Sequence, residues 1–226
     1  MPTLDFLKQQ FPDGFDSGDI LASACPRRDS QEAAIGGSYR EVFEKAILPY
    51  LKTDSVVLEL GPGAGSWSRA ILAHIPAGTL HTIDFQDVTQ WLLPRQYDGR
   101  LVCHRVQDNT LGCIDDGSID FSWSFGVLCH NNIEHIEQML AATLGKMKPG
   151  GVACHQYGDW DKLEAFGWAR TIIPIDFKDK PDDEIWWPRN TSDRMKAAAE
   201  AGGWTVLAAD LDLVKRDGII LLRKPD

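Results

Sequence analysis

A glycine-rich turn directly after an apolar strand is the part of this sequence whose residue types and spacing are best suited to chemistry. The apolar run from Val56 to Leu60 is interrupted only by Glu59, and glycines follow at positions 61, 63 and 65. Glycines allow a backbone with positive φ and let a ligand approach without meeting a Cβ atom. The pattern predicts a buried parallel strand that turns into a helix and binds a nucleotide-like ligand.

The spacing of the turn separates two classes of cofactor. The dinucleotide fingerprint G-x-G-x-x-G places a pyrophosphate on the helix N-terminus, but Ser66 stands where its last glycine would be. Glu59 would repel a pyrophosphate and suits a cation. With Glu59 before G-x-G-x-G, the chain resembles the class I S-adenosylmethionine (SAM)-dependent methyltransferases, whose cofactor is a sulfonium without phosphate. An NAD-dependent Rossmann oxidoreductase, a non-catalytic SAM-binding protein and an ordinary glycine-rich turn stay as alternatives.

The charge, the cysteine content and the lengths of the apolar segments restrict the kinds of molecule that this protein is expected to bind. The formal net charge of −10 disfavours nucleic acid over most of the surface. Five cysteines without a C-x-x-C pair indicate neither a disulfide framework nor a zinc knuckle. No stretch reaches the length of a membrane span, and the N-terminus lacks a basic segment followed by an apolar run. We therefore expect a cytoplasmic protein with a small-molecule acceptor as its partner, without nucleic acid or membrane.

The order of apolar segments predicts an α/β fold with a doubly wound, mostly parallel sheet and helices on both faces. The resemblance implies seven strands with an antiparallel last strand. We expect one domain over residues 1–226, in which residues 1–38 form an N-terminal helical lid or a surface wrap. A helix is expected over Tyr39–Leu51, and a fifth strand over Val152–Tyr157 after a break at Lys148–Gly151. Residues 158–190 form an insertion after that strand, on the acceptor side or as plain core packing.

The resemblance also implies cofactor residues at the ends of successive strands. Asp84 would accept hydrogen bonds from the ribose hydroxyls, with capping of the next helix as the alternative. Asp108 would accept from the adenine amino group, with capping of its own loop as the alternative. The full set expected to bind the cofactor is Glu59, Gly61, Gly63, Gly65, Asp84, Phe85, Asp108, Asn109 and Phe125.

Methyl transfer to a hydroxyl needs a base to remove the proton. His130 follows the fourth strand and is our first candidate, with a structural histidine as the alternative; His155 and Asp159, at the end of the fifth strand, are the others. A metal site is left unassigned. No Asp/Asn-Pro-Pro-Tyr/Phe signature follows the fourth strand, so we expect O-methylation of a sugar, aromatic or polyketide-like metabolite, with N-methylation as the alternative. The aromatic residues expected to contact the acceptor are Tyr39, Tyr157, Trp160 and Trp186.

Overall fold

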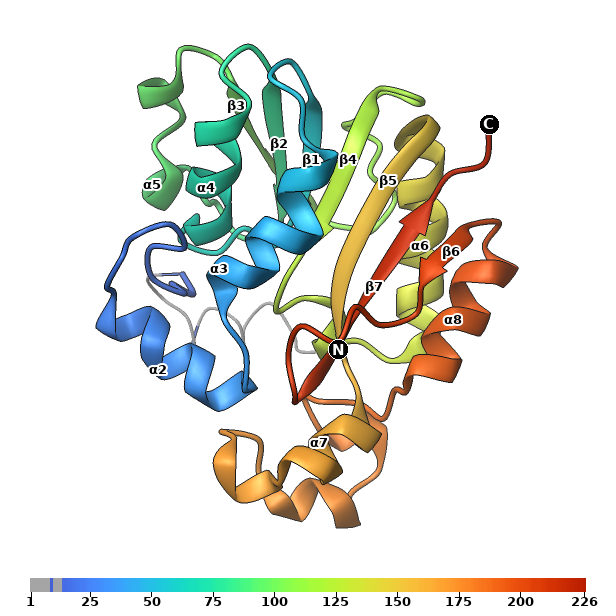
Figure 1. Cartoon of the computed structure of the whole chain (residues 1–226). Coiled ribbons are helices and arrows are strands. Elements are labelled where there is room, and N and C mark those ends of the chain that lie inside the picture. The colour runs from blue at the N-terminus through green and yellow to red at the C-terminus, as the bar shows by residue number, and fades with distance from the viewer. Residues whose placement is uncertain (1–8, 10–13) are drawn as a thin grey trace.

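A seven-stranded sheet forms the centre of the molecule, with strand order β3-β2-β1-β4-β5-β7-β6 (Figure 1). The computed structural model describes residue 9 and residues 14–226. Strand β7 runs antiparallel to both of its neighbours, and the pairs among β1 to β5 are parallel, which confirms the predicted fold class. The strands are β1 (Val56–Leu60), β2 (Thr79–Asp84), β3 (Leu101–Arg105), β4 (Ile119–Ser124), β5 (Met147–Gly158), β6 (Thr205–Ala208) and β7 (Asp217–Arg223).

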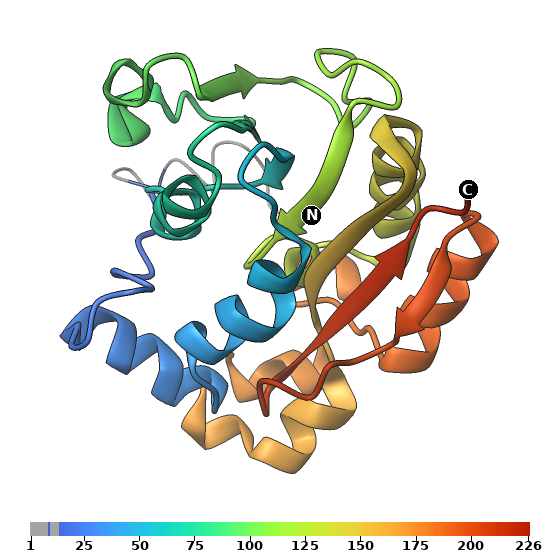
Figure 2. The same ribbon diagram turned by 45° about the horizontal axis from the view of Figure 1, so that its top comes forward.

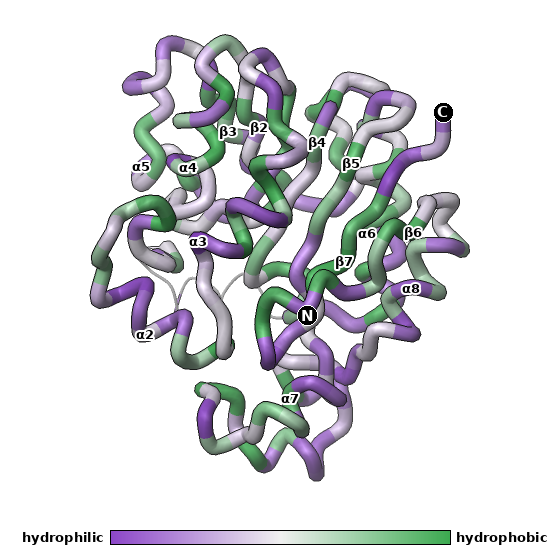
Figure 3. The backbone as a smooth tube through the Cα atoms, in the orientation of Figure 1, coloured by the Kyte–Doolittle hydropathy of each residue, from purple (hydrophilic) through white to green (hydrophobic). Residues whose placement is uncertain are grey.

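Helices cover both faces of the sheet. Helices α3 and α4 pack on one face and α6 and α8 on the other, which Figure 2 shows as blue and teal against yellow and orange. Strand β7 is coloured hydrophobic along most of its length, whereas α8 alternates between hydrophilic and hydrophobic residues (Figure 3). The α-helices are α2 (Pro26–Ile35), α3 (Tyr39–Val42), α4 (Ser66–His74), α5 (Thr89–Leu92), α6 (Ile133–Lys146), α7 (Trp160–Phe166) and α8 (Ser192–Ala201).

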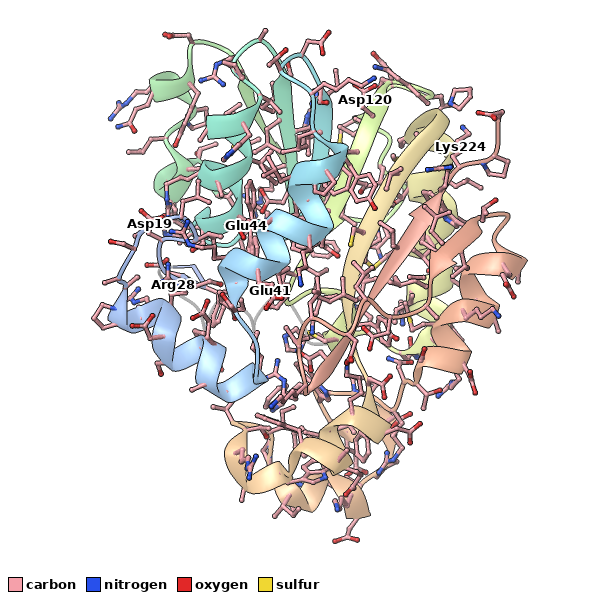
Figure 4. The ribbon with its side chains drawn as sticks, viewed as in Figure 1. Asp19, Arg28, Glu41, Glu44, Asp120 and Lys224 are labelled. Carbon is pink, nitrogen blue, oxygen red and sulfur yellow. The ribbon has the colours of Figure 1, made fainter. Side chains whose placement is uncertain are left out.

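Strand β1 lies in the middle of the sheet because its side chains are apolar on both faces. Val57 contributes to one hydrophobic core and Leu58 to the other, and both are fully buried. At its start, the Val56 N–H donates to the Asp120 carboxylate at 2.8 Å. Asp120 and Lys224 lie at the upper edge in Figure 4, whereas the parallel strands end at the lower edge.

Capping residues set the starts of two long helices. The Asn132 side chain accepts from the His135 N–H at the start of α6. Thr191 does the same for the Arg194 N–H at the start of α8. These caps fix the residue at which each helix begins after its preceding loop, near the edge of the sheet at which the parallel strands end.

The structure differs from the sequence prediction at two element boundaries. The helix expected over residues 39–51 is α-helical only to Val42 and continues as a π-helix (Phe43–Ile47) and a 3₁₀ turn (Leu48–Tyr50), because Pro49 has no N–H to donate to the preceding turn. Strand β5 begins at Met147, so the expected break at 148–151 lies within the strand. Met147 pairs with Ile119, and the register then shifts at a bulge.

Residues 14–38 wrap across the lower left of the sheet in Figure 1 and include α2. Arg28 is buried and donates to the carbonyl oxygens of Asp19 and Ala22 at 2.9 and 2.6 Å, which fastens the segment before α2 (Figure 4). Residues 1–8 and 10–13 of the predicted lid lie outside the described residues.

The insertion after β5 folds around a small hydrophobic core of its own. It contains α7 and the short helical turns Trp168–Arg170, Ile175–Asp179 and Asp182–Glu184. The core residues are Cys129, Leu163, Trp168, Ile173, Phe177, Ile185 and Trp187. Trp168, Phe177 and Trp187 therefore pack in this core, while Trp186 and Trp187 also border the cavity described below, so the insertion has features of both interpretations.

Two further features concern membrane crossing and the state of the cysteines. Across the described residues, none of the helices combines the length and the apolar character needed to cross a membrane. All five cysteines are unpaired thiols.

Candidate active site

A cavity of about 860 Å³ opens at the carboxyl ends of the parallel strands. Its walls include the loops that follow β1 to β4, the N-terminal segment 15–39 and the insertion from Ile172 to Trp187, and residues of α6 and β5 and Arg216, just before β7, complete them. Ligand pockets in open α/β sheets lie at this edge, and the volume is typical of a small-molecule site.

The glycine turn lines one side of the cavity through Gly61 and Gly63, which have φ of 63° and 54°. A Cβ atom on Gly61 would lie 2.4 Å from Val127, and one on Gly63 would lie 2.4 Å from the Phe15 carbonyl oxygen. Both positions therefore require glycine for conformation and for space. Gly65, with φ of 84°, packs on Leu92 and does not line the cavity.

The segment before α2 is attached directly to this turn. The Ala64 N–H donates to the Phe15 carbonyl oxygen at 2.8 Å. The Ser66 hydroxyl donates to Asp16 and accepts from the Ser17 N–H, each at 3.0 Å. Ser66, the residue that breaks the dinucleotide fingerprint, thus binds the N-terminal segment.

Glu59 is 2% exposed and does not line the cavity. Its carboxylate accepts from the Ser68 hydroxyl of α4. Burial raises the pKa of Glu59 to about 7, although Ser68 and Arg69 oppose the shift. The side chain therefore supports the glycine turn from beneath, and it is not placed to contact a ligand in the cavity.

Asp84 and Phe85 line the cavity at the end of β2. The Asp84 carboxylate accepts from the Gln86 N–H at 2.8 Å and also from the Phe85 backbone. Burial raises the pKa of the Asp84 carboxyl above its ordinary value. Asp84 thus borders the cavity, and it does not cap the next helix, which was the alternative interpretation, because Val88 is the N-cap residue of α5.

Asp108 and Asn109 line the cavity beyond the end of β3. The Asp108 carboxylate accepts from the Thr110 N–H and hydroxyl at 2.9 and 2.7 Å, and these bonds lower its pKa. The residue therefore caps its own turn while it borders the cavity, so it has features of both interpretations that the sequence allows.

Aromatic rings form the middle of the cavity wall. The ring centroid of Tyr39 lies 5.2 Å from that of Trp67 and 5.1 Å from that of Phe125, and all three residues line the cavity. Burial raises the pKa of the Tyr39 phenol. The hydroxyl consequently stays protonated and is not available as a base at neutral pH.

His130 lies in the turn Leu128–His130 that follows β4, and it lines the cavity. Its Nδ1 lies 2.7 Å from the carbonyl oxygen of Trp186. Because a carbonyl only accepts, Nδ1 carries the ring proton and Nε2 keeps its lone pair. Burial lowers the pKa of His130 below its ordinary value. The neutral ring is thus held in the tautomer that can take a proton at Nε2.

The other two candidate bases lie away from the cavity. His155 is 1% exposed, its Nδ1 lies 2.8 Å from the Ser124 hydroxyl, and burial lowers its pKa to about 3. Asp159 caps α7 and accepts from the Ser192 N–H at 3.1 Å. Both side chains are held within the protein, so the structure does not bring them to His130.

Of the four residues predicted to contact the acceptor, two line the cavity and two do not. Tyr39 and Trp186 line the cavity, whereas Tyr157 and Trp160 do not. The Tyr157 hydroxyl donates to the Ala209 carbonyl at 3.0 Å, and the Trp160 indole N–H donates to the Trp187 carbonyl at 3.1 Å. These two are parts of the fold beside the site.

Several lining residues were missed by the sequence analysis, notably Gln31, Gln156, Trp187 and Arg216. Arg216 directly precedes the last apolar strand, which was its only local signal. Within the described chain, no group of three or more His, Cys, Asp or Glu side chains is arranged to hold a metal ion.

Comparisons with known proteins agree with this geometry. Residues 57–151 match the family model described as a methyltransferase domain. None of the curated proteins matches the chain. The similar solved structures include a Pyrococcus horikoshii OT3 protein, which is 14% identical with a TM-score of 0.65 and for which the match covers 96% of this chain and 97% of that one.

Two other similar structures have named activities. The 1,6-didemethyltoxoflavin-N1-methyltransferase of Burkholderia thailandensis, with its substrate and S-adenosylhomocysteine bound, is 14% identical with a TM-score of 0.56, and the match covers 83% of this chain and 82% of that one. The geranyl diphosphate C-methyltransferase of Streptomyces coelicolor A3(2), in complex with Mg²⁺, geranyl diphosphate and S-adenosyl-L-homocysteine, is 11% identical with a TM-score of 0.61, with coverage of 82% and 81%. At these identities the likeness shows the fold.

The chain contains a methyltransferase domain over residues 57–151, and this matched segment includes the glycine turn, Asp84, Asp108 and His130. The protein is an enzyme of the SAM-dependent methyltransferase class, which confirms the resemblance and the cofactor drawn from the glycine turn. The match decides against the NAD-dependent alternative.

Proposed function

We propose that this enzyme methylates a hydroxyl group of a small molecule, with His130 as the general base. The observation that carries the proposal is the hydrogen bond between His130 Nδ1 and the Trp186 carbonyl oxygen at 2.7 Å. That bond leaves Nε2 as the nitrogen that accepts a proton from the acceptor hydroxyl. No group in the described chain donates a hydrogen bond to Nε2.

The residues that line the cavity fit the cofactor. Gly61 and Gly63 let the turn pack closely against Val127 and the Phe15 carbonyl oxygen while it lines the cavity, and the Asp84 carboxylate is proposed to accept from the ribose hydroxyls. Phe85, Asp108 and Asn109 are proposed to border the adenine, and Phe125 the reacting end. Glu59 and Gly65 are proposed to shape the turn without contact. When bound, SAM supplies the methyl group on its sulfonium.

Methyl transfer requires the acceptor to be aligned and water to be excluded. Tyr39, Trp67, Phe125 and Trp186 provide an apolar wall beside His130. The N-terminal segment contributes Phe15, Ser17, Gln31 and Ile35 to the cavity, which supports its proposed role as a lid over residues 1–38. The insertion over 158–190 contributes the opposite wall of the same single domain.

The fold alone does not choose the atom that is methylated, because the Burkholderia neighbour is an N1-methyltransferase and the Streptomyces neighbour a C-methyltransferase. Both act on small molecules, which supports an acceptor of that kind. The neutral base at His130 favours a hydroxyl. The net charge of −10 supports the absence of a nucleic-acid partner. The cytoplasmic location remains a prediction, supported by five unpaired thiols.

The test compares His130→Gln with a matched variant, His155→Gln, which alters a buried histidine away from the cavity. Both variants should bind S-adenosylhomocysteine with the affinity of the wild type in titration calorimetry. Methyl transfer from labelled SAM to a library of phenols and sugars should fall by about 100-fold or more in His130→Gln alone. Equal rates in wild type and His130→Gln would refute the assignment of the base.

A further inference from the structure

A buried arginine forms part of the cavity wall close to the proposed base. Arg216 lies just before β7, is 7% exposed and lines the cavity, while Asp217 beside it is fully buried. The Arg216 Nε and Nη2 donate to the two carboxylate oxygens of Asp217 at 2.8 and 2.7 Å. This two-point contact fixes the plane of the guanidinium group.

A second residue, Gln156, donates to the same carboxylate. The Gln156 Nε2 donates to Asp217 at 2.8 Å, and the Gln156 Oε1 accepts from the Gly126 N–H at 2.8 Å. Gly126 follows β4, and both Gly126 and Gln156 line the cavity. The guanidinium is therefore tied through Asp217 and Gln156 to the same loop that delivers His130.

The indole of Trp187 connects Arg216 with His130. The guanidinium carbon lies 4.7 Å from the centre of the Trp187 ring, and the His130 ring centroid lies 5.3 Å from it. The sum of these distances limits the separation of the two groups to about 10 Å. This limit keeps the guanidinium within reach of a substituent on a small acceptor whose hydroxyl lies at His130.

The guanidinium retains unused donors. Arginine has five N–H groups in a fixed plane, and no group of the described chain accepts a hydrogen bond from Nη1. Removal of such donors from water is costly unless an acceptor atom meets them. An sp² oxygen of a carbonyl or carboxylate is the atom that this planar arrangement suits best.

The geometry points to Arg216 as the acceptor-binding residue that selects planar hydroxylated compounds with a carbonyl or carboxylate oxygen near the reacting hydroxyl. The inference rests on the proposed hydroxyl methylation for the identity of the ligand. Aromatic rings of Trp186, Phe125 and Tyr39 along the wall favour a flat ring over a flexible chain. Arg216 orients the acceptor, and His130 takes the proton.

The experiment uses three probes on the full chain saturated with S-adenosylhomocysteine: salicylate, 2-hydroxyacetophenone and phenol. The first two have a carboxylate or ketone oxygen beside the hydroxyl, and phenol has neither. Calorimetric titration should give affinities at least about 10-fold higher for these two than for phenol. A preference for salicylate alone would specify a carboxylate, and equal affinity for the first two a neutral carbonyl.

The variant must avoid a lone buried charge at Asp217, so the double variant Arg216→Met/Asp217→Asn removes both charges together. It should lose the preference for salicylate and 2-hydroxyacetophenone, while it keeps its affinity for phenol and for S-adenosylhomocysteine. A wild type without the preference, or a double variant that keeps it, would overturn the role of Arg216. Failure of the proposed function has a different signature: methyl transfer that is unaffected by His130→Gln.

Discussion

The buried carboxyl of Glu59 makes the stability of this enzyme depend on pH in a direction that can be worked out from its surroundings. Burial raises its pKa to about 7, whereas the value for an exposed glutamate is 4.5. The folded state therefore binds the proton more tightly than the unfolded state. The contribution to stability is fully present below pH 4.5 and is lost as the pH rises through 7.

The size of the effect follows from the shift. A difference of about 2.5 pKa units corresponds to about 3 kcal/mol over the whole range, of which about 2.5 kcal/mol falls between pH 5 and pH 8.5. The variant Glu59→Gln cannot ionise and keeps a side chain of the same shape beside Ser68. Its free energy of unfolding should therefore lack this part of the pH dependence.

Urea unfolding gives the free energy of unfolding of the wild type and of Glu59→Gln at pH 5 and at pH 8.5. The change with pH in the variant is then compared with the change in the wild type, so that the contributions of other titrating groups cancel. The stability of the variant relative to the wild type should rise by about 2.5 kcal/mol at the higher pH. A change below about 0.5 kcal/mol, or one of opposite sign, would show that Glu59 titrates normally and that its burial has been misjudged.

Two further predictions concern the cofactor end of the cavity. Gly63→Ala places a Cβ atom 2.4 Å from the Phe15 carbonyl oxygen, so the affinity for S-adenosylhomocysteine should fall by at least about 10-fold. The control for backbone strain is Gly117→Ala, because Gly117 has a φ of 65° and no atom near the position of a Cβ. This control variant should bind S-adenosylhomocysteine as the wild type does. Asp84→Asn should weaken binding of S-adenosylhomocysteine by about 10-fold while it changes the free energy of unfolding by less than about 1 kcal/mol, because the carboxylate accepts only from backbone groups of its own turn, for which the Asn amide oxygen is also an acceptor. Calorimetric affinities equal to the wild type would contradict either assignment.

The cofactor end could be predicted from the sequence because its geometry is local. The glycine turn needs only its spacing, and Asp84 needs only the rule that parallel strands end at one edge of the sheet. Glu59 shows where that logic stops. The sequence correctly placed Glu59 on β1. Successive side chains of a strand point to opposite faces, however, and the Glu59 carboxylate contacts Ser68 of α4 instead of the cavity.

The acceptor end was harder because its residues come from distant parts of the chain. His130 and His155 both follow apolar runs, and the sequence treats them as similar candidates. They differ because His155 lies within β5 and meets Ser124 of the neighbouring strand, whereas His130 lies in a loop. Arg216 is held at the cavity by Trp187 and by Asp217, which Gln156 also binds, and no local pattern encodes the contacts with Trp187 and Gln156.

The tautomer of His130 links the chemistry to the insertion. The hydrogen-bond partner of its Nδ1 is the carbonyl of Trp186, which lies 56 positions further along the chain. Asp159 anchors the insertion by capping α7 and accepting from the Ser192 N–H at the start of α8. Because any residue at position 186 supplies a carbonyl oxygen, the tautomer of His130 does not depend on the side chain there. A displacement of the backbone at that position would instead free Nδ1 and remove the preset lone pair on Nε2.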